Sequence, residues 1–273
     1  LYLEIEDERD RWPPLDLETW LLVFRRLSRL DVLKVLGRDP FDRPDLPDLI
    51  RGIREEIQPT ILQLNTSAEH PEKTCQILRK TGWPGLHLRV GIQSWPPKES
   101  TLEMLKRLLV VRRKRGFQLG LNVHVTSKCR DDLDLIQSWC TKRKIGFFPG
   151  IPVNPVLFRE TPETLESYRI DNEDIEAVAR STASSQGSGY GRVLRHFLSL
   201  ANQQTLWGLS KHGPCQKFSC QELSALAYIL PNGNVVSCGL RTGPVGDLTT
   251  QDLSEIWYSP AAYEARRSIR SCS

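Results

Sequence analysis

The 273-residue sequence lacks the marks of several large protein classes. No apolar run approaches membrane-spanning length and no signal peptide opens the chain, so we expect no membrane partner. No Gly-x-Gly-x-x-Gly follows an expected strand, which leaves a dinucleotide-binding fold unsupported. The seven cysteines, four of them at or after position 215, do not form an even disulfide framework. A reducing, cytoplasmic location suits such thiols.

Charge gives little support to nucleic-acid binding. The 37 Lys and Arg residues nearly balance the 33 Asp and Glu residues, for a net charge of +4. The basic runs at 112–115 and 142–144 each end an expected helix, where cations meet the negative end of the helix dipole. Neither run carries the interleaved aromatic side chains that stack on bases. We therefore interpret both runs as solvated helix ends and expect no nucleic-acid partner.

Strand and helix patterns alternate through the first part of the chain. Expected strands lie at 32–36, 60–64, 86–92, 117–125 and 145–149. Expected helices begin after Asp16 and at about 45, 71, 100 and 131, and the fourth opens with a capping box of Ser100 and Glu103. Such alternation implies an α/β fold with a parallel sheet, either open or closed into a barrel. Because no dinucleotide fingerprint is present, we favour a barrel, whose functional side chains lie at the carboxyl ends of its strands.

The most informative stretch runs from Cys220 to Cys238. Residues 226–230 predict a short strand, 231–234 a turn with an Asn-Gly pair, and 235–236 the start of a return strand. A β-hairpin brings its two outer ends together, so the two cysteines should lie near each other. Converging cysteines suggest a metal site.

This stretch and its surroundings resemble the SPASM or twitch extension of radical S-adenosylmethionine (AdoMet) enzymes. The spacing is Cys-x12-Gly-x4-Cys, and the segments 245–248 and 253–257 with Arg266-Arg267 are similar to the extension's "VGNL … SLxEIW … R". The resemblance implies a partial (β/α)6 barrel whose first strand lies before Leu1, followed by a small hairpin and helix extension. It implies a barrel at 1–155, a helical connector with a Ser/Gly-rich linker at 156–210, and an iron-sulfur domain at 211–273.

The barrel segment also carries matches to the family. Gly37, Arg38, Asp39 and Pro40, followed by Arg-Pro-Asp-Leu at 43–46, are similar to "TGGEPLLRPDL", whose Gly-Gly-Glu holds the methionyl amino group of AdoMet. Arg38 replaces the second Gly of that motif, and Asp39 replaces its Glu. The alternative interpretation is an ordinary strand-to-helix turn.

Later strands supply the other expected AdoMet contacts. Asn65 ends a strand as in the family's "TNG", and Gln93 lies where the family often has "SLDG". Asn122 and His124 alternate onto one face of a strand, although a lone His on a strand is more often a core residue. Ile151 belongs to a segment that would pack near the adenine by analogy.

The resemblance also implies an auxiliary [4Fe-4S] cluster in the C-terminal region. Its expected ligands are Cys215, Cys220, Cys238 and Cys272. The spacing Cys215-x4-Cys220 is looser than the Cys-x2-Cys usual for structural zinc, although His212 keeps zinc as a rival. The other cysteines, at 75, 129 and 140, are expected to be small buried hydrophobes.

One family motif is missing. Radical AdoMet chemistry needs a cluster held by three thiols with one open iron, and the family supplies them as Cys-x3-Cys-x2-Cys after the first strand. No such spacing occurs here. Either the loop precedes Leu1 or the motif has degenerated. We favour the first, because residues 1–3 and 15–18 resemble the sequence that follows the cysteine loop in relatives.

The sequence therefore predicts a fragment of a radical AdoMet enzyme. Its substrate would be a peptide, a protein or a small molecule, and a reducing electron donor would be its partner. The alternative is a non-catalytic metal-binding or interaction module on a degenerate barrel. The codons upstream of Leu1 distinguish the two, because the enzyme requires a Cys-x3-Cys-x2-Cys motif there.

Overall fold

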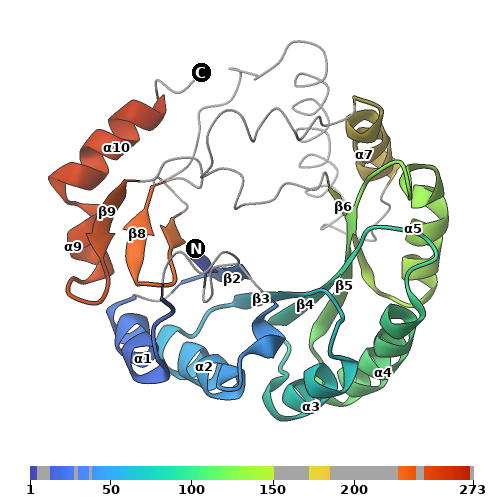
Figure 1. The fold of residues 1–273 in the computed structure, drawn as a ribbon, viewed down its shortest axis with the longest axis horizontal. Helices are drawn as coiled ribbons and strands as arrows, with labels where there is room; N and C mark the ends of the chain where they lie inside the picture. Colours follow the sequence, from blue (N-terminus) through green and yellow to red (C-terminus); the bar gives the residue numbers. More distant parts are fainter. Residues whose placement is uncertain are drawn as a thin grey trace.

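The computed structural model describes residues 1–4, 13–27, 30–36, 39–150, 172–184, 227–237 and 243–270. These residues contain a nine-stranded sheet with the order β6-β5-β4-β3-β2-β1-β7-β8-β9. The sheet is curved, and helices lie along its convex side (Figure 1). None of the described helices is long and apolar enough to cross a membrane.

The barrel part of the sheet is built from strands that alternate with helices. The strands are β1 (Tyr2–Glu4), β2 (Val32–Leu36), β3 (Ile61–Thr66), β4 (Leu86–Ile92), β5 (Gln118–His124) and β6 (Gly146–Gly150). The helices are α1 (Leu17–Arg26), α2 (Leu46–Gly52) with a π-helical turn (Ile53–Ile57), α3 (Pro71–Thr81), α4 (Glu99–Arg115), α5 (Leu133–Lys142) and α7 (Asn172–Ser184). Short 3₁₀ turns occupy Pro40–Asp42 and Arg130–Asp132.

All neighbouring pairs from β1 to β6 are parallel, which confirms the sequence prediction for β2 to β6. The expectation that the first strand lies before Leu1 is wrong for this structure. Tyr2–Glu4 forms that strand and pairs with β2 and with β7. The segment after it, residues 5–12, lies outside the described residues.

Alternation along each strand separates two faces. On β4 the residues Leu86, Leu88, Val90 and Ile92 are buried, whereas His87, Arg89 and Gly91 between them are half-buried. The apolar set packs beneath the helices on the convex side, because a strand directs successive side chains to opposite faces. The inner, concave face therefore receives the polar side chains.

The predicted N-terminal cap is confirmed for α1 and is wrong for α4. Asp16 caps α1 as expected, because its Oδ1 accepts the backbone N–H of Thr19 at 2.8 Å. The capping box at Ser100 and Glu103 is wrong, since α4 begins at Glu99 after Lys98 and has no side-chain cap. Glu103 instead accepts a hydrogen bond at 3.0 Å from Arg107, one turn further along the helix.

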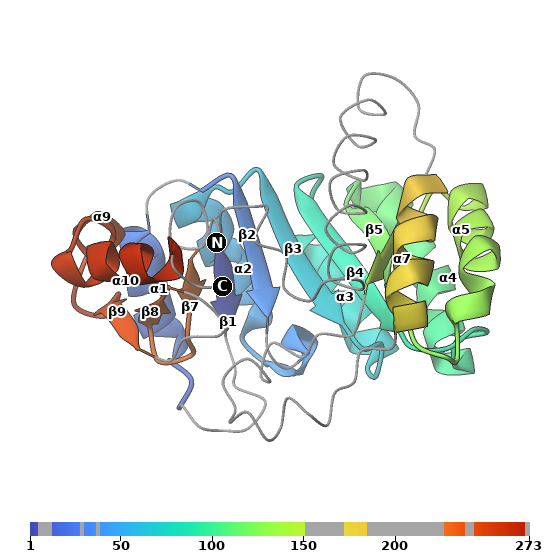
Figure 2. The same cartoon turned by 90° about the horizontal axis from the view of Figure 1, so that it is seen from above.

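The predicted hairpin is confirmed as β7 (Tyr228–Ile229) and β8 (Asn234–Val236), which pair antiparallel across a turn with Gly233 at φ +84°. It continues the barrel sheet, because β7 pairs with β1, and β9 (Pro244–Asp247) extends the sheet by one more strand. The helices α9 (Leu253–Trp257) and α10 (Pro260–Arg270) follow. In Figure 2 they lie near α1, at the opposite end of the sheet from α5 and α7.

The packing of β9 against α9 explains the C-terminal motif. A Cβ on Gly246 would come within 2.5 Å of Ile256 Cγ1, and Ile256 is fully buried. Asp252 and Glu255 form a capping box that starts α9. Arg266 donates to the carbonyl of Trp257 and lies 4.9 Å from the centroid of its ring. The motif residues thus hold β9, α9 and α10 together.

We expect Gly246→Ala to lower the free energy of unfolding by about 1–3 kcal/mol, because the added methyl group overpacks the contact with Ile256. Gly243→Ala is the matched control, since no described atom lies within 4 Å of its Cβ position. It should change stability by less than about 0.5 kcal/mol. Urea unfolding followed by circular dichroism measures both, and equal effects would contradict the packing argument.

Candidate functional site

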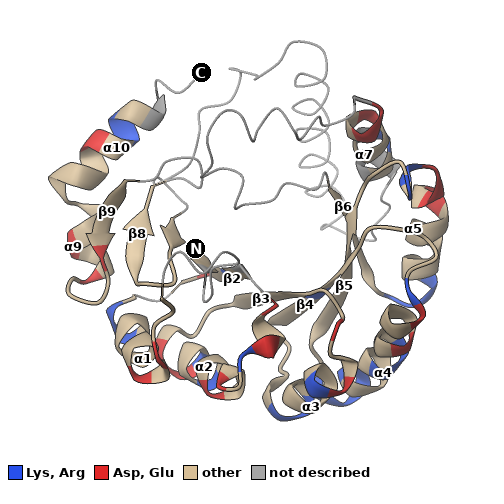
Figure 3. Cartoon of the chain, viewed as in Figure 1, with Lys and Arg blue, Asp and Glu red and all other residues tan. Residues whose placement is uncertain are grey.

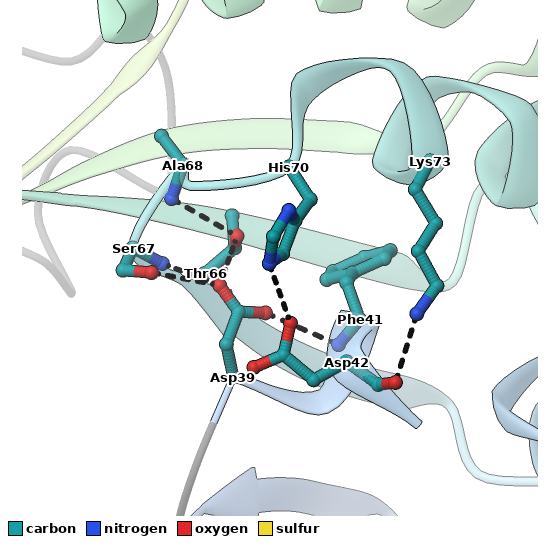
Figure 4. A network of polar contacts seen from close by, with 8 residues as sticks. All are labelled: Asp39, Phe41, Asp42, Thr66, Ser67, Ala68, His70 and Lys73. Carbon is teal, nitrogen blue, oxygen red and sulfur yellow. Dashed lines mark hydrogen bonds and ion pairs between the residues drawn. The ribbon is translucent and has the colours of Figure 1, made fainter. Parts of the chain in front are cut away.

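The carboxyl ends of β2 and β3 are joined by the side chain of Asp39. Its Oδ2 accepts hydrogen bonds from the Thr66 hydroxyl at 2.7 Å and from the backbone N–H and the hydroxyl of Ser67 at 2.8 and 3.0 Å. Its Oδ1 accepts the backbone N–H of Phe41 at 3.1 Å. Figure 4 shows the carboxylate between the two loops. A carboxylate has about four acceptor positions, so this one serves chiefly to connect the loops.

The segment after Asp39 is held by further polar contacts. Arg43, only 6% exposed, forms a fork onto Asp45 with its Nε and Nη2 at 2.8 and 2.7 Å from the carboxylate oxygens. Asp42 accepts from Lys73 through its carbonyl at 2.8 Å, and its carboxylate lies 3.2 Å from His70 Nε2 (Figure 4). The Arg-Pro-Asp-Leu match to the family therefore corresponds to an ion pair that fixes the chain leading into α2.

Asn65 is the penultimate residue of β3 and Gln93 is the first residue after β4, and the two have different surroundings. Asn65 is half-buried, and its Oδ1 accepts a hydrogen bond from Gln63 Nε2 at 3.2 Å. Gln93 is exposed just beyond β4, and its carbonyl accepts a hydrogen bond from the Thr126 hydroxyl at 3.4 Å. Both residues are placed at the carboxyl end of the sheet.

Asn122 and His124 lie on the same face of β5, as the alternation predicts. Asn122 Nδ2 lies 3.2 Å from His124 Nε2. With Asn122 as donor, Nε2 is the acceptor and the imidazole is neutral. Burial lowers the pKa of His124, which favours the same state. The strand register places Gly91 beside Asn122 and Gly150 beside His124.

The described cysteines behave as buried hydrophobes, as predicted. Cys75, Cys129 and Cys140 are all at most 2% exposed and form no disulfide. Burial raises the pKa of Cys140 to about 12, so its thiol stays protonated at neutral pH. No group of three or more metal-ligating side chains occurs in the part of the chain that the structure describes.

Several predicted site residues lie outside the described residues. They are Gly37, Arg38, Ile151 and the four proposed cluster ligands, Cys215, Cys220, Cys238 and Cys272. Their contacts therefore stay predictions, as does the assignment of AdoMet contacts to Asp39, Pro40, Asn65, Gln93, Asn122 and His124. The domain limits at 155 and 210 also fall among residues that are not described.

Sequence reasoning missed the polar residues deeper on the inner face. Lys34 lies in the middle of β2, and its Nζ is 3.3 Å from the Tyr2 hydroxyl. Arg89 lies in the middle of β4, with its guanidinium carbon 3.6 Å from the Phe148 ring centroid. Each is a cation between buried apolar residues. A charged residue within an otherwise apolar strand sequence is the signal that could have identified both positions.

Comparison with known proteins supports the fold and one domain. Residues 220–273 match the model of the SPASM family, an iron-sulfur cluster-binding domain. Streptococcus suis SuiB has a similar structure, with a TM-score of 0.56 and 15% identity over 98% of this chain and 68% of that chain. The structure of native anSMEcpe with bound AdoMet and Kp18Cys peptide is also similar, with a TM-score of 0.57 and 12% identity over 98% of this chain and 83% of that chain. No curated protein sequence matches the chain.

The architecture is that of an α/β protein with a partial parallel barrel, as the sequence predicted. The comparisons confirm the resemblance noted in the sequence for the fold and for the C-terminal domain. The chain combines a partial barrel similar in fold to SuiB and anSMEcpe with a segment, residues 220–273, that matches the SPASM iron-sulfur cluster-binding domain.

We expect Asp39→Asn to lower the free energy of unfolding by about 1–3 kcal/mol, because in either orientation the amide nitrogen would face a donor, the Phe41 N–H or those of Thr66 and Ser67. Asp42→Asn is the control, since it removes only an exposed pair with His70 and should cost less than about 0.5 kcal/mol. Urea unfolding compares the two. Equal stability of both variants would show that Asp39 does not hold the loops together.

Proposed function

We propose that this chain supplies the AdoMet-binding barrel and the auxiliary-cluster domain of a radical AdoMet enzyme that modifies a peptide or a small molecule. The observation that carries the proposal is the SPASM match at residues 220–273, whose described hairpin continues the parallel barrel sheet. The bound AdoMet and peptide of the similar anSMEcpe structure favour AdoMet as cofactor and a peptide as substrate.

Open positions beside polar groups support an AdoMet site at the carboxyl ends of β4 to β6. A Cβ on Gly91 would come no closer than 3.7 Å to a described atom, and none lies within 4 Å at Gly150. These glycines neighbour Asn122 and His124. A polar cofactor fits such a surface, because it finds hydrogen-bonding groups next to backbone that it can approach closely. Gly37, Arg38, Asp39, Pro40, Asn65, Gln93 and Ile151 complete the proposed contact set.

An auxiliary [4Fe-4S] cluster is proposed at Cys215, Cys220, Cys238 and Cys272. Thiolate is the usual protein ligand of such clusters, and three of these cysteines fall within the SPASM match. Bound there, the cluster would carry electrons from a reducing donor. Cys75, Cys129 and Cys140 are not candidates, because each packs in the apolar core and no group of three ligating side chains forms among the described residues.

Metal analysis of the anaerobically reconstituted protein tests the cluster. We expect stoichiometric iron and sulfide, a large loss of both in Cys238→Ala, and retention of both in Cys75→Ala, the matched control for losing one thiol. Elemental analysis and sulfide assay give the result. Stoichiometric zinc without iron would overturn the cluster and favour a zinc module in which His212 is a further ligand.

We expect the 273-residue chain not to cleave AdoMet by itself. It contains no Cys-x3-Cys-x2-Cys and therefore no thiol set for a cluster with an open iron. With dithionite and AdoMet, chromatography with mass detection should find no 5′-deoxyadenosine. The expectation that the motif precedes Leu1 is wrong for this structure, because the first strand is Tyr2–Glu4 and the stretch between it and α1 contains no Cys. Formation of 5′-deoxyadenosine by the printed chain would mean that the cysteines have been misinterpreted.

A further inference from the structure

Arg89 occupies an unusual position on the inner face of the sheet. Its neighbours in the strand, Leu88 and Val90, are fully buried on the opposite face beneath the helices. Charged residues otherwise concentrate on the outer helices, and the strands are mostly uncharged (Figure 3). A cation in the middle of a parallel strand is costly to bury, so it calls for a chemical reason.

The guanidinium of Arg89 packs against the ring of Phe148. Its carbon lies 3.6 Å from the centroid of the Phe148 ring, a cation–π contact. A Cβ on Gly120 or on Gly146 would come within 2.6 Å of the same ring, so Phe148 lies directly over these two glycines. The register places Arg89, Gly120 and Gly146 side by side on β4, β5 and β6. One side of the guanidinium is thereby covered by the ring.

Arg89 has no acidic partner among the described residues. Other arginines with little exposure are paired, since Arg43 binds Asp45 and Arg130 binds Glu173 and Asp174. Burial lowers the pKa of Arg89, as expected for a cation without a compensating anion.

The inner face around Arg89 offers donors and few acceptors. Glu4, the acidic residue of β1, is three strands away by register, about 14 Å at the usual strand spacing. Asn65 is the register partner of Arg89 on β3. Its Oδ1 accepts a hydrogen bond from Gln63, and its amide also carries two N–H donors. Lys34 adds a second cation on β2.

We infer that Arg89 binds a carboxylate of the substrate, so that the substrate is a peptide with an acidic side chain or a free C-terminal carboxylate. This inference deepens the proposed function and rests on it. The planar fork of a guanidinium matches the two oxygens of a carboxylate. Arg89 lies two residues before Gly91, about 6.6 Å deeper along β4 than this glycine of the proposed AdoMet site. The carboxylate is therefore assigned to the substrate rather than to the cofactor.

Binding of two small probes tests the inference without turnover. N-acetyl-glutamate methylamide and N-acetyl-glutamine methylamide differ only in the charge of the side chain. In ligand-observed NMR titrations of the anaerobically reconstituted full chain, the acidic probe should bind about tenfold or more tightly than the neutral one. Arg89→Gln should abolish that preference. Arg107→Gln, the control on the outer surface of α4, should keep it.

Three results would overturn the inference. They are equal binding of the two probes to the parent chain, an unchanged preference in Arg89→Gln, and displacement of the acidic probe by AdoMet, which would assign the cation to the cofactor. Thermal unfolding of Arg89→Met adds a separate readout. An unchanged or higher Tm supports a ligand-binding role, and a clear decrease would show that Arg89 is a structural support for Phe148.

The iron analysis fails or succeeds independently of this titration. A probe preference that depends on Arg89 in a chain that binds zinc and no iron would retain the carboxylate site and reject the radical enzyme. Equal binding of the two probes to a chain that binds iron and sulfide would reject the carboxylate site and retain the radical enzyme.

Discussion

The parallel pairing of β1 with β7 is the contact on which the arrangement of the two parts depends. Tyr2 donates its backbone N–H to the carbonyl of Ala227 at 2.9 Å, and its ring stacks on Tyr228 with centroids 4.6 Å apart. At the turn of the hairpin, Leu15 donates to the carbonyl of Pro231 at 3.0 Å. A strand of three residues thus joins the barrel to the C-terminal hairpin in one sheet. The SPASM part begins from a fixed position relative to the barrel.

The alternation of side chains along the strands then divides packing from chemistry. The outward positions of β3, β4 and β5 are buried and, apart from Thr66, apolar, and they supply the core beneath the helices. The inward positions carry Asn65, Arg89, Asn122 and His124, whose polar groups would be expensive to bury without partners. The fold can therefore change its inner face without loss of the core, which is how one barrel serves different substrates.

Much of this could be predicted from sequence, because the patterns involved are local. Strands β2 to β6 follow from apolar runs between helical segments, and the hairpin from its Asn-Gly turn. Strand β1 could not be predicted, since three residues are too few for a periodic pattern and their strand conformation comes from pairing on both sides. The start of α4 was misplaced because Glu103 pairs with Arg107 rather than with the helix N-terminus.

The candidate site also contains features that the sequence could predict and features that it could not. Asn122 and His124 could be placed together because residues two apart share a face of a strand. The role of Asp39 could not be foreseen, because its partners Thr66 and Ser67 come from a different strand end. That network has a consequence for the proposed AdoMet site: with three hydrogen bonds already on Oδ2, only Oδ1 retains capacity for an ammonium group. The loops that follow β2 and β3 are thus held by the same carboxylate that would meet the cofactor, so binding and loop structure should change together at this residue.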